Sequence, residues 1–222
     1  MPERKAIQDQ AKMMVKQDII EPAKTPWSSQ IIIIKKPMSK GGGFRLVNDL
    51  REINKKTKFW SYELPLTTDY FRALSGNKYF TALDALSGFY QIPVKVEDRD
   101  ITGFIVPGLG SFRYKRMPQG AKNAPQTYSC LMDIALGDLK YEAALVFMDD
   151  ILVPGKSWSA HLSKLRKVFS ALRKACLTLK YEKCIFAAAV IKFLGKIISR
   201  HGIKIDFKQI EAIAKMLITL DY

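Results

Sequence analysis

Residues 143–153 read Ala-Ala-Leu-Val-Phe-Met-Asp-Asp-Ile-Leu-Val, an apolar and β-prone run that is interrupted at its centre by Asp149 and Asp150. The stretches on either side suit the two arms of a β-hairpin, with the acids at or beside its tight turn. Two carboxylates in an apolar setting repel each other and lose hydration, so their pKa values should rise unless a cation neutralises them. A divalent metal ion is the natural cation, although an Asp-Asp turn exposed to water is the simpler alternative.

A third acid stands in the same kind of setting. Residues 79–84 read Tyr-Phe-Thr-Ala-Leu-Asp, so a second apolar run ends on Asp84. Three acids supplied by two apolar strands predict a metal site formed by Asp84, Asp149 and Asp150. Ligands that are all oxygen suit Mg²⁺ or Mn²⁺, and two such ions about 3.5–4 Å apart are the arrangement that polymerases and nucleases use for phosphoryl transfer.

These runs resemble the motifs of a known family. The sequence Phe-Met-Asp-Asp at residues 147–150 resembles the Tyr/Phe-x-Asp-Asp motif of reverse transcriptases, which are RNA-directed DNA polymerases. Residues 83–92, Leu-Asp-Ala-Leu-Ser-Gly-Phe-Tyr-Gln-Ile, resemble the first acidic motif of such enzymes from Ty3/gypsy-type LTR retrotransposons. The resemblance implies an α+β fold, in which a polymerase palm has an antiparallel sheet packed on helices and follows an N-terminal fingers lobe. It also implies template-directed addition of dNTPs to a primer 3′-hydroxyl, with two Mg²⁺ (or Mn²⁺) ions as cofactors.

Further blocks in the family's order imply a nucleotide-binding site. Arg45 resembles the arginine that grips the triphosphate, a task that suits its planar and permanently charged fork. Gln119 resembles the glutamine that lies against the nucleotide sugar. By the same resemblance, the main-chain carbonyl of Ala85 completes a metal shell, and Phe89 lies beneath the sugar, where it excludes a 2′-hydroxyl. Lys183 corresponds, more loosely, to the lysine that protonates the departing pyrophosphate.

The resemblance also implies how the chain is organised. Phe193, Leu194 and Gly195 open a segment similar to the hairpin that holds the primer end, here called the primer grip. Residues 1–78 would be mainly fingers and residues 79–222 mainly palm with at most the start of a thumb, and the two interleave around 85–120. The expected partners are an RNA or DNA template with its primer, dNTPs, and the RNase H, integrase and protease of a longer polyprotein.

Composition agrees with a nucleic-acid partner without proving it. The 222 residues include 36 Lys or Arg and 21 Asp or Glu, giving a net charge of +15, and charge alone would fit a membrane surface or a ribosome equally well. Cys130, Cys176 and Cys184 include no Cys-x-x-Cys pair, which argues against a zinc site and against a disulfide framework. No apolar run reaches the roughly 18–20 residues of a membrane span. We therefore expect an intracellular protein, in the cytoplasm or a virus-like particle, with no membrane partner.

Local patterns predict several further features. Ile31 to Ile34 read as a buried strand. Asn123 is expected to cap the helix that contains Tyr128 and Met132, and Ser159 to cap a later helix with an apolar stripe. The Lys and Arg side chains of that later helix are expected to be solvated, with at most a minor attraction for a nucleic-acid backbone.

Two other functions remain open at the level of sequence. The chain could be a non-catalytic or domesticated nucleic-acid-binding remnant that has kept the fold but lacks the thumb and RNase H, although intact acids argue against complete decay. An RNA-templated RNA polymerase would share the palm acids, but the bulky Phe89 and the fingers resemblance disfavour it. Primer extension on an RNA template, comparing dNTPs with NTPs, separates the three.

Overall fold

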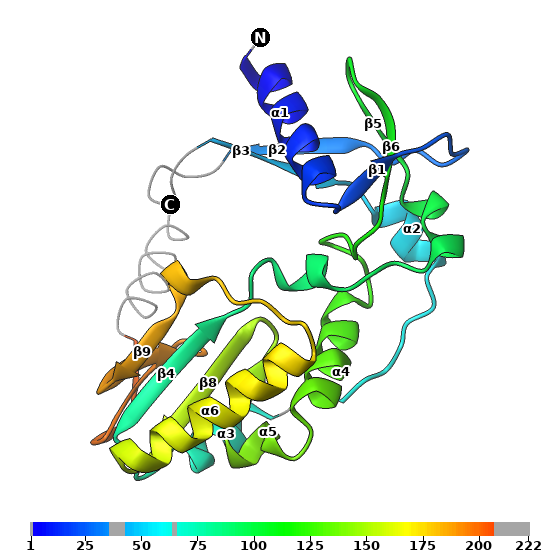
Figure 1. The fold of residues 1–222 in the computed structure, drawn as a ribbon. Helices are drawn as coiled ribbons and strands as arrows, with labels where there is room; N and C mark the ends of the chain where they lie inside the picture. The colour runs from blue at the N-terminus through cyan, green and yellow to red at the C-terminus, as the bar shows by residue number, and fades with distance from the viewer. Residues whose placement is uncertain (1, 36–42, 64–65, 207–222) are drawn as a thin grey trace, which may run out of the picture. The chain divides into compact units, whose positions relative to one another are not determined.

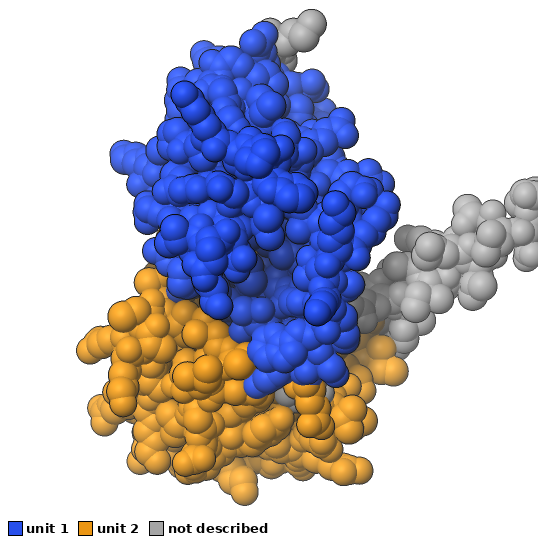
Figure 2. Space-filling model, turned by 90° about the vertical axis from the view of Figure 1, so that its right-hand side faces the viewer, with its two compact units in different colours: residues 1–62, 87–128 blue, residues 63–86, 129–222 orange. Residues whose placement is uncertain are grey.

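The computed structural model describes residues 2–35, 43–63 and 66–206, and its contacts divide the chain into two compact units (Figure 1, Figure 2). Unit 1 consists of residues 1–62 and 87–128, and unit 2 consists of residues 63–86 and 129–222. The chain therefore crosses between the units three times. The division into fingers and palm is a functional assignment, and it stays a prediction.

Unit 1 is built around helix α1 and a small antiparallel sheet. Its elements are α1 (Pro2–Lys16), β1 (Ile20–Pro22), β2 (Ile31–Lys35), β3 (Phe44–Asn48), α2 (Arg51–Lys56), the 3-10 helices η2 (Gly88–Gln91), η3 (Val96–Asp98) and η4 (Asp100–Thr102), β5 (Phe104–Val106), β6 (Gly110–Tyr114) and the beginning of α4 (Ala124–Leu136). Ile7, Ala11 and Met14 recur at helical spacing and are buried in one cluster with Phe104 and Phe112. The strand order of this sheet is β1-β6-β5, while β2 pairs with β3.

Unit 2 is built around a second antiparallel sheet with the strand order β7-β8-β4-β9. Its elements are α3 (Thr67–Ala73), β4 (Tyr79–Asp84), the remainder of α4, α5 (Leu139–Glu142), β7 (Leu145–Phe147), β8 (Asp150–Gly155), α6 (Trp158–Lys174), the 3-10 helix η5 (Tyr181–Lys183), β9 (Ile185–Ala188), β10 (Val190–Phe193), β11 (Lys196–Ser199) and β12 (Gly202–Ile205). Strands β10, β11 and β12 form a further antiparallel sheet.

The two faces of the β7-β8-β4-β9 sheet are covered by different elements. Phe80 and Leu152 pack into a core cluster with side chains of α3, β10 and β11. Successive strand residues point to opposite faces, so Thr81 faces the other way, where it contacts His161 of α6. Figure 1 shows α6 lying across β8 and β4. The close approach requires glycine at position 155, because a Cβ there would lie 2.5 Å from the Cβ of His161.

Two local predictions are corrected by the structure. The strand at Ile31 to Ile34 forms, but Ile32, Ile33 and Ile34 are exposed, because β2 pairs with β3 alone in a two-stranded sheet of the described residues. Ser157, not Ser159, caps α6, since its Oγ accepts a hydrogen bond from the N–H of Ala160 at 3.3 Å.

Asn123 does precede α4, but its side chain is used elsewhere. It accepts from the N–H of Trp60 and donates to the carbonyl of Lys58. The Asn123 side chain therefore connects residues 58–60 to the start of α4. The predicted role of this side chain as the helix cap is wrong, because its hydrogen bonds go to that segment.

Candidate active site

The two adjacent acids lie at a tight β-hairpin turn, as their sequence predicts. Phe147 of β7 pairs with Asp150 of β8, which leaves Met148 and Asp149 as the two turn residues. Met148 has a φ of 51°, the sign that the first residue of a type II′ turn requires and that glycine usually supplies. A methionine in this region carries strain of roughly 1–3 kcal/mol, which persists only because the paired strands over-determine the turn.

The third acid is brought to the same place by strand pairing. The register of β4 and β8 sets Asp84 directly opposite Asp150, at the end of the sheet where the β7–β8 turn lies. Residues that are far apart in sequence therefore form one cluster of carboxylates. The sheet fixes its geometry, because every step of the register from Tyr79 to Asp84 is paired.

The electrostatics of the cluster match the physical expectation for crowded acids. Burial raises the pKa of the Asp149 carboxyl, and the nearby charges of Asp150 and Asp84 raise it further. Burial and the charge of Asp84 likewise raise the pKa of Asp150, while Lys183 opposes the shift at both residues. Asp149 Oδ1 is buried and has no hydrogen-bond partner among the described residues.

Lys183 is in direct contact with the first of these acids. Its Nζ lies 3.1 Å from Asp84 Oδ2 and 3.4 Å from Asp84 Oδ1. The main chain holds η5 in place, because the N–H of Lys180 donates to the carbonyl of Asp84 at 2.8 Å. The neighbouring Ala85 is buried and bridges to Leu179. Lys183, which corresponds only loosely to the family's lysine, thus lies beside the carboxylate cluster.

The donor set suits a hard cation. Three carboxylates, one with a buried and unpartnered oxygen, are the chemistry that Mg²⁺ and Mn²⁺ prefer. Within the described residues, however, no group of three or more His, Cys, Asp or Glu side chains is gathered closely enough to hold an ion as it stands. The acids are therefore close enough to raise each other's pKa, but Asp84 is engaged by the Lys183 ammonium.

A buried polar network behind the acids was not anticipated from the sequence. Thr81 Oγ1 lies 2.9 Å from His161 Nε2 and accepts a hydrogen bond from the N–H of Ala187 at 3.0 Å. The β4–β9 register shifts at this point, and Ala187 has a φ of 50°. The Thr81 hydroxyl therefore accepts from an N–H of β9 that is not paired in the irregular β4–β9 hydrogen bonding. It links β9 and α6 to β4, the strand that carries Asp84. The sequence feature that could have indicated this network is His161, a polar residue among the apolar positions of α6.

The predicted nucleotide-binding residues Arg45, Phe89 and Gln119 belong to unit 1, whereas the acids belong to unit 2. Phe89 lies half-buried in η2, and its ring meets that of Tyr128 edge-on at 5.9 Å. Gln119 is also half-buried. The backbone of Arg45 pairs with Ile34, and its side chain lies outside the described part of the structure. Their roles stay predictions.

The predicted primer-grip residues form a hairpin turn. Phe193 ends β10, Lys196 begins β11, and Leu194 and Gly195 connect them with φ values of 48° and 73°. Two positive φ values are the signature of a type I′ turn. Phe193 is buried against Tyr70, so the hairpin is anchored in the core of unit 2. Its contact with a primer stays a prediction.

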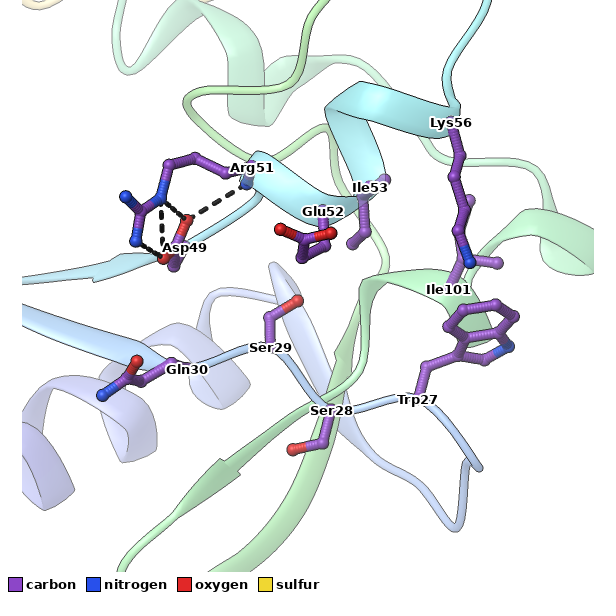
Figure 3. Close-up of a pocket in the computed structure, with 10 residues that line it drawn as sticks. All are labelled: Trp27, Ser28, Ser29, Gln30, Asp49, Arg51, Glu52, Ile53, Lys56 and Ile101. Atoms are coloured by element: carbon purple, nitrogen blue, oxygen red, sulfur yellow. Dashed lines mark hydrogen bonds and ion pairs between the residues drawn. The ribbon is translucent and has the colours of Figure 1, made fainter.

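Unit 1 contains a pocket of about 510 Å³ that the sequence did not nominate (Figure 3). Arg51 forms a fork with Asp49, with Nε to Oδ1 at 2.9 Å and Nη2 to Oδ2 at 2.6 Å, and this hydrogen bonding lowers the pKa of Asp49 to about 2. On the far side of the pocket, the Lys56 Nζ lies 5.6 Å from the Trp27 ring centroid. The lining is completed by Ser28, Ser29, Gln30, Glu52, Ile53 and Ile101.

A comparison with family models decides which family this fold and these acids represent. Residues 34–198 match the model described as "Reverse transcriptase (RNA-dependent DNA polymerase)". The matched range contains the three acids, Lys183 and the primer-grip turn. This chain belongs to the reverse transcriptase family.

Curated relatives of this reverse transcriptase chain are retrotransposon polyproteins, as the resemblance to the Ty3/gypsy type implies. It is 37% identical over 210 residues to the "Retrovirus-related Pol polyprotein from transposon 412" of Drosophila melanogaster, covering 93% of this chain and 17% of the relative. It is 34% identical to the corresponding polyprotein from transposon opus of the same organism (96% and 21%) and 32% identical to the "Transposon Tf2-3 polyprotein" of Schizosaccharomyces pombe (89% and 14%). The chain thus spans about a fifth or less of the length of these relatives.

Solved structures confirm the α+β reverse transcriptase fold. The foamy viral protease-reverse transcriptase in complex with RNA/DNA hybrid superposes with a TM-score of 0.83 at 24% identity, covering 95% of this chain and 28% of that one. The same viral protein, in a form solved with double-stranded DNA, gives a TM-score of 0.85 at 24% identity, covering 96% of this chain and 37% of that one. In the described residues, no helix of the reverse transcriptase chain is long and apolar enough to cross a membrane.

Proposed function

We propose that this chain is the fingers and palm part of an RNA-directed DNA polymerase from a retrotransposon polyprotein, and that it adds dNTPs to a primer 3′-hydroxyl. The observation that carries the proposal is the β4–β8 register, which sets Asp84 opposite Asp150 beside the strained turn at Asp149. Membership of the reverse transcriptase family supports it. The proposed setting is intracellular, in the cytoplasm or a virus-like particle, and the proposed partners are the remaining polyprotein domains.

Asp84, Asp149 and Asp150 would hold two Mg²⁺ (or Mn²⁺) ions, and the buried, unpartnered Asp149 Oδ1 supports this assignment. When bound, such ions would activate the primer hydroxyl and neutralise charge on the triphosphate. Protein groups mainly position the reactants. Lys183, whose Nζ lies beside Asp84, would donate a proton to the leaving pyrophosphate.

The remaining site residues bind and orient. Arg45 would steady the triphosphate, Gln119 would lie against the sugar, and the carbonyl of Ala85 would add an oxygen ligand. Phe89 would exclude a 2′-hydroxyl, and Phe193, Leu194 and Gly195 would present the primer end. The foamy viral structures were solved with RNA/DNA hybrid and with double-stranded DNA, which supports a template-primer duplex as substrate here.

The test of the metal-dependent reaction is extension of a DNA primer on an RNA template by the 222-residue chain, with Mn²⁺ binding measured separately by titration calorimetry. Asp149→Asn should lower the extension rate by about 10³-fold or more, because loss of a metal ligand removes several kcal/mol of transition-state stabilisation. It should also weaken Mn²⁺ binding. Asp138→Asn is the matched control, since Asp138 is an exposed acid of unit 2 whose side chain makes no cap hydrogen bond.

Normal extension by a folded Asp149→Asn protein would refute the metal assignment. A wild-type chain that binds RNA but neither extends primers nor binds Mn²⁺ would establish the non-catalytic remnant instead.

The choice of sugar is tested at Phe89. Phe89→Val should raise the kcat/KM for CTP relative to that for dCTP, because a smaller side chain leaves room for a 2′-hydroxyl. A purely structural role of the ring, in its contact with Tyr128, would instead depress both values together and lower Tm. An unchanged ratio in a folded, active variant would remove Phe89 from the site and reopen the alternative of an RNA-synthesising polymerase.

A further inference from the structure

The positive charge of the chain is concentrated around α6. Residues 151–181 contain seven Lys or Arg and no Asp or Glu, whereas the whole chain has a net charge of +15. Nearly half of the excess positive charge therefore lies in about a seventh of the sequence. Solvated helix surfaces usually mix both signs of charge, so this segment differs from an ordinary polar face.

Helix geometry places four of these seven charges on one side of α6. The side chains that face the sheet are His161, Leu165, Val168 and Leu172. At about 100° per residue, the opposite side carries Ser163 and Ser170 along its midline, with Arg166 and Arg173 to one side and Lys167 and Lys174 to the other. All six residues are exposed. These six residues are called the basic face of α6.

The acids that the structure describes do not pair with the cations of the basic face. Within the described residues, no ion pair joins Arg166, Lys167, Arg173 or Lys174 to a carboxylate. On each side of the midline the two like charges are seven residues, or about 10 Å, apart along the helix. The repulsion among them would be relieved by a partner that carries regularly spaced negative charges.

The chemistry of the face selects among polyanionic partners. Firm binding to a lipid surface combines cations with large apolar side chains that enter the bilayer, and the basic face has no such apolar side chains. A phosphodiester backbone requires cations and hydroxyl donors, and the face supplies both. Its convex surface suits a flexible single strand that can bend around the helix, and the serine hydroxyls can pair with the 2′-hydroxyl groups of RNA.

We propose that the basic face of α6 binds the sugar-phosphate backbone of single-stranded RNA, at a surface separate from the carboxylate cluster. The separation follows from the fold of unit 2. The basic face points away from the β7-β8-β4-β9 sheet, whereas Asp84, Asp149 and Asp150 lie at the β7–β8 turn and the adjoining end of β4. Such a surface would hold template RNA outside the catalytic centre and raise its local concentration.

The experiment measures binding of a fluorescein-labelled, unstructured 20-nucleotide RNA to the full chain by fluorescence anisotropy, in EDTA and without nucleotides. The test variant combines Arg166→Gln, Lys167→Gln, Arg173→Gln and Lys174→Gln. Glutamine has a helix propensity close to that of Lys and Arg, so α6 should remain folded, which a thermal melt verifies. The matched control combines Arg4→Gln, Lys5→Gln, Lys12→Gln and Lys16→Gln, which removes four exposed cations from α1.

We expect the α6 variant to bind the RNA at least about 10-fold more weakly at 0.1 M salt, and its log–log salt slope to be smaller by about 0.7 for each phosphate that it no longer neutralises. The affinity of the α1 control should fall much less. Equal reductions in the two variants would show that only the net charge matters, and would overturn the proposal. Because the assay involves no polymerisation, its result is independent of the proposed enzymatic activity.

Two further measurements separate RNA from the other partners. Ser163→Ala with Ser170→Ala should reduce the preference for RNA over a DNA strand of the same sequence while leaving DNA binding unchanged. Vesicles of phosphatidylserine should lose no more affinity for the α6 variant than for the α1 control, because each variant loses four cations. Equal affinity for RNA and DNA in the wild type, or lipid binding that disappears in the α6 variant but not in the α1 control, would contradict the proposal.

Discussion

The hairpins β2–β3 and β7–β8 have similar apolar sequences but opposite fates. In β2, Ile32, Ile33 and Ile34 are 42%, 38% and 48% exposed, whereas in β8, Ile151 and Leu152 are 1% and 0% exposed. The difference lies in the neighbours. In the described part of the chain β2 pairs with β3 alone, while β8 lies between β7 and β4, with α6 on one face and the α3, β10 and β11 cluster on the other. Whether an apolar strand is buried therefore depends on the strands and helices that pack around it, and not on its own composition.

The largest test of this comparison removes one side chain from each hairpin. Leu152→Ala should lower the free energy of unfolding by about 2–5 kcal/mol, because it leaves a cavity between packed layers. Ile33→Ala should cost less than about 1 kcal/mol, because its side chain already contacts water. Urea denaturation of both variants measures the difference. Similar costs at the two sites would mean that β2 is covered in solution.

A second test concerns the polar network that supports the acid-bearing strand. Thr81→Val keeps the shape of the side chain but leaves the Ala187 N–H and His161 without their partner, so it should cost about 1–3 kcal/mol. Thr81→Ser keeps the hydroxyl and should restore most of this stability. If the two variants melt at the same temperature, the hydroxyl makes no net contribution.

A third test uses pH to probe the layer between the sheet and α6. Burial lowers the pKa of His161, and the charge of Lys164 lowers it further. As the pH falls through about 6.5, the imidazole of His161 is therefore protonated in the unfolded chain while it stays neutral in the folded chain. Stability that is present above about pH 6.5 should be lost as the pH falls toward the lowered folded pKa, by at most about 1.4 kcal/mol per pH unit. Urea titrations of wild type and His161→Gln should differ in this dependence, and parallel curves would exclude His161 as its source.

The smallest effect is expected at the turn of the buried hairpin. In EDTA, Asp149→Asn should raise Tm slightly, by the equivalent of less than about 1 kcal/mol, because it removes a carboxylate that Asp84 and Asp150 repel. The control Asp138→Asn should leave Tm unchanged. A lower Tm for Asp149→Asn would show that the carboxylate makes a stabilising contact in solution.

Some of the site could be predicted because its signals are local. An apolar run broken by two acids implies a hairpin turn, and Met148 and Asp149 do form it. The segment Phe193 to Gly195 likewise lies at the turn between two strands. Turn geometry depends on a few neighbouring residues, so the chain itself specifies it.

Other features depended on contacts that are distant in sequence. Ser157 and Ser159 are equally plausible caps by residue type, and the start of α6 decides between them. Asn123 bonds to residues 58–60, and Thr81 meets His161 and Ala187, pairings that no local pattern encodes.

The sequence by itself determined the chemistry of this protein: which residues carry charge, where strands break on acids, and which helix positions are apolar. Tertiary structure alone decided that Asp84 stands opposite Asp150, that Lys183 reaches Asp84, and that three of four consecutive isoleucines, Ile32 to Ile34, stay exposed. The physical reason is that charge and periodicity belong to the residues of a segment, whereas burial and register are set by which other segments pack against it.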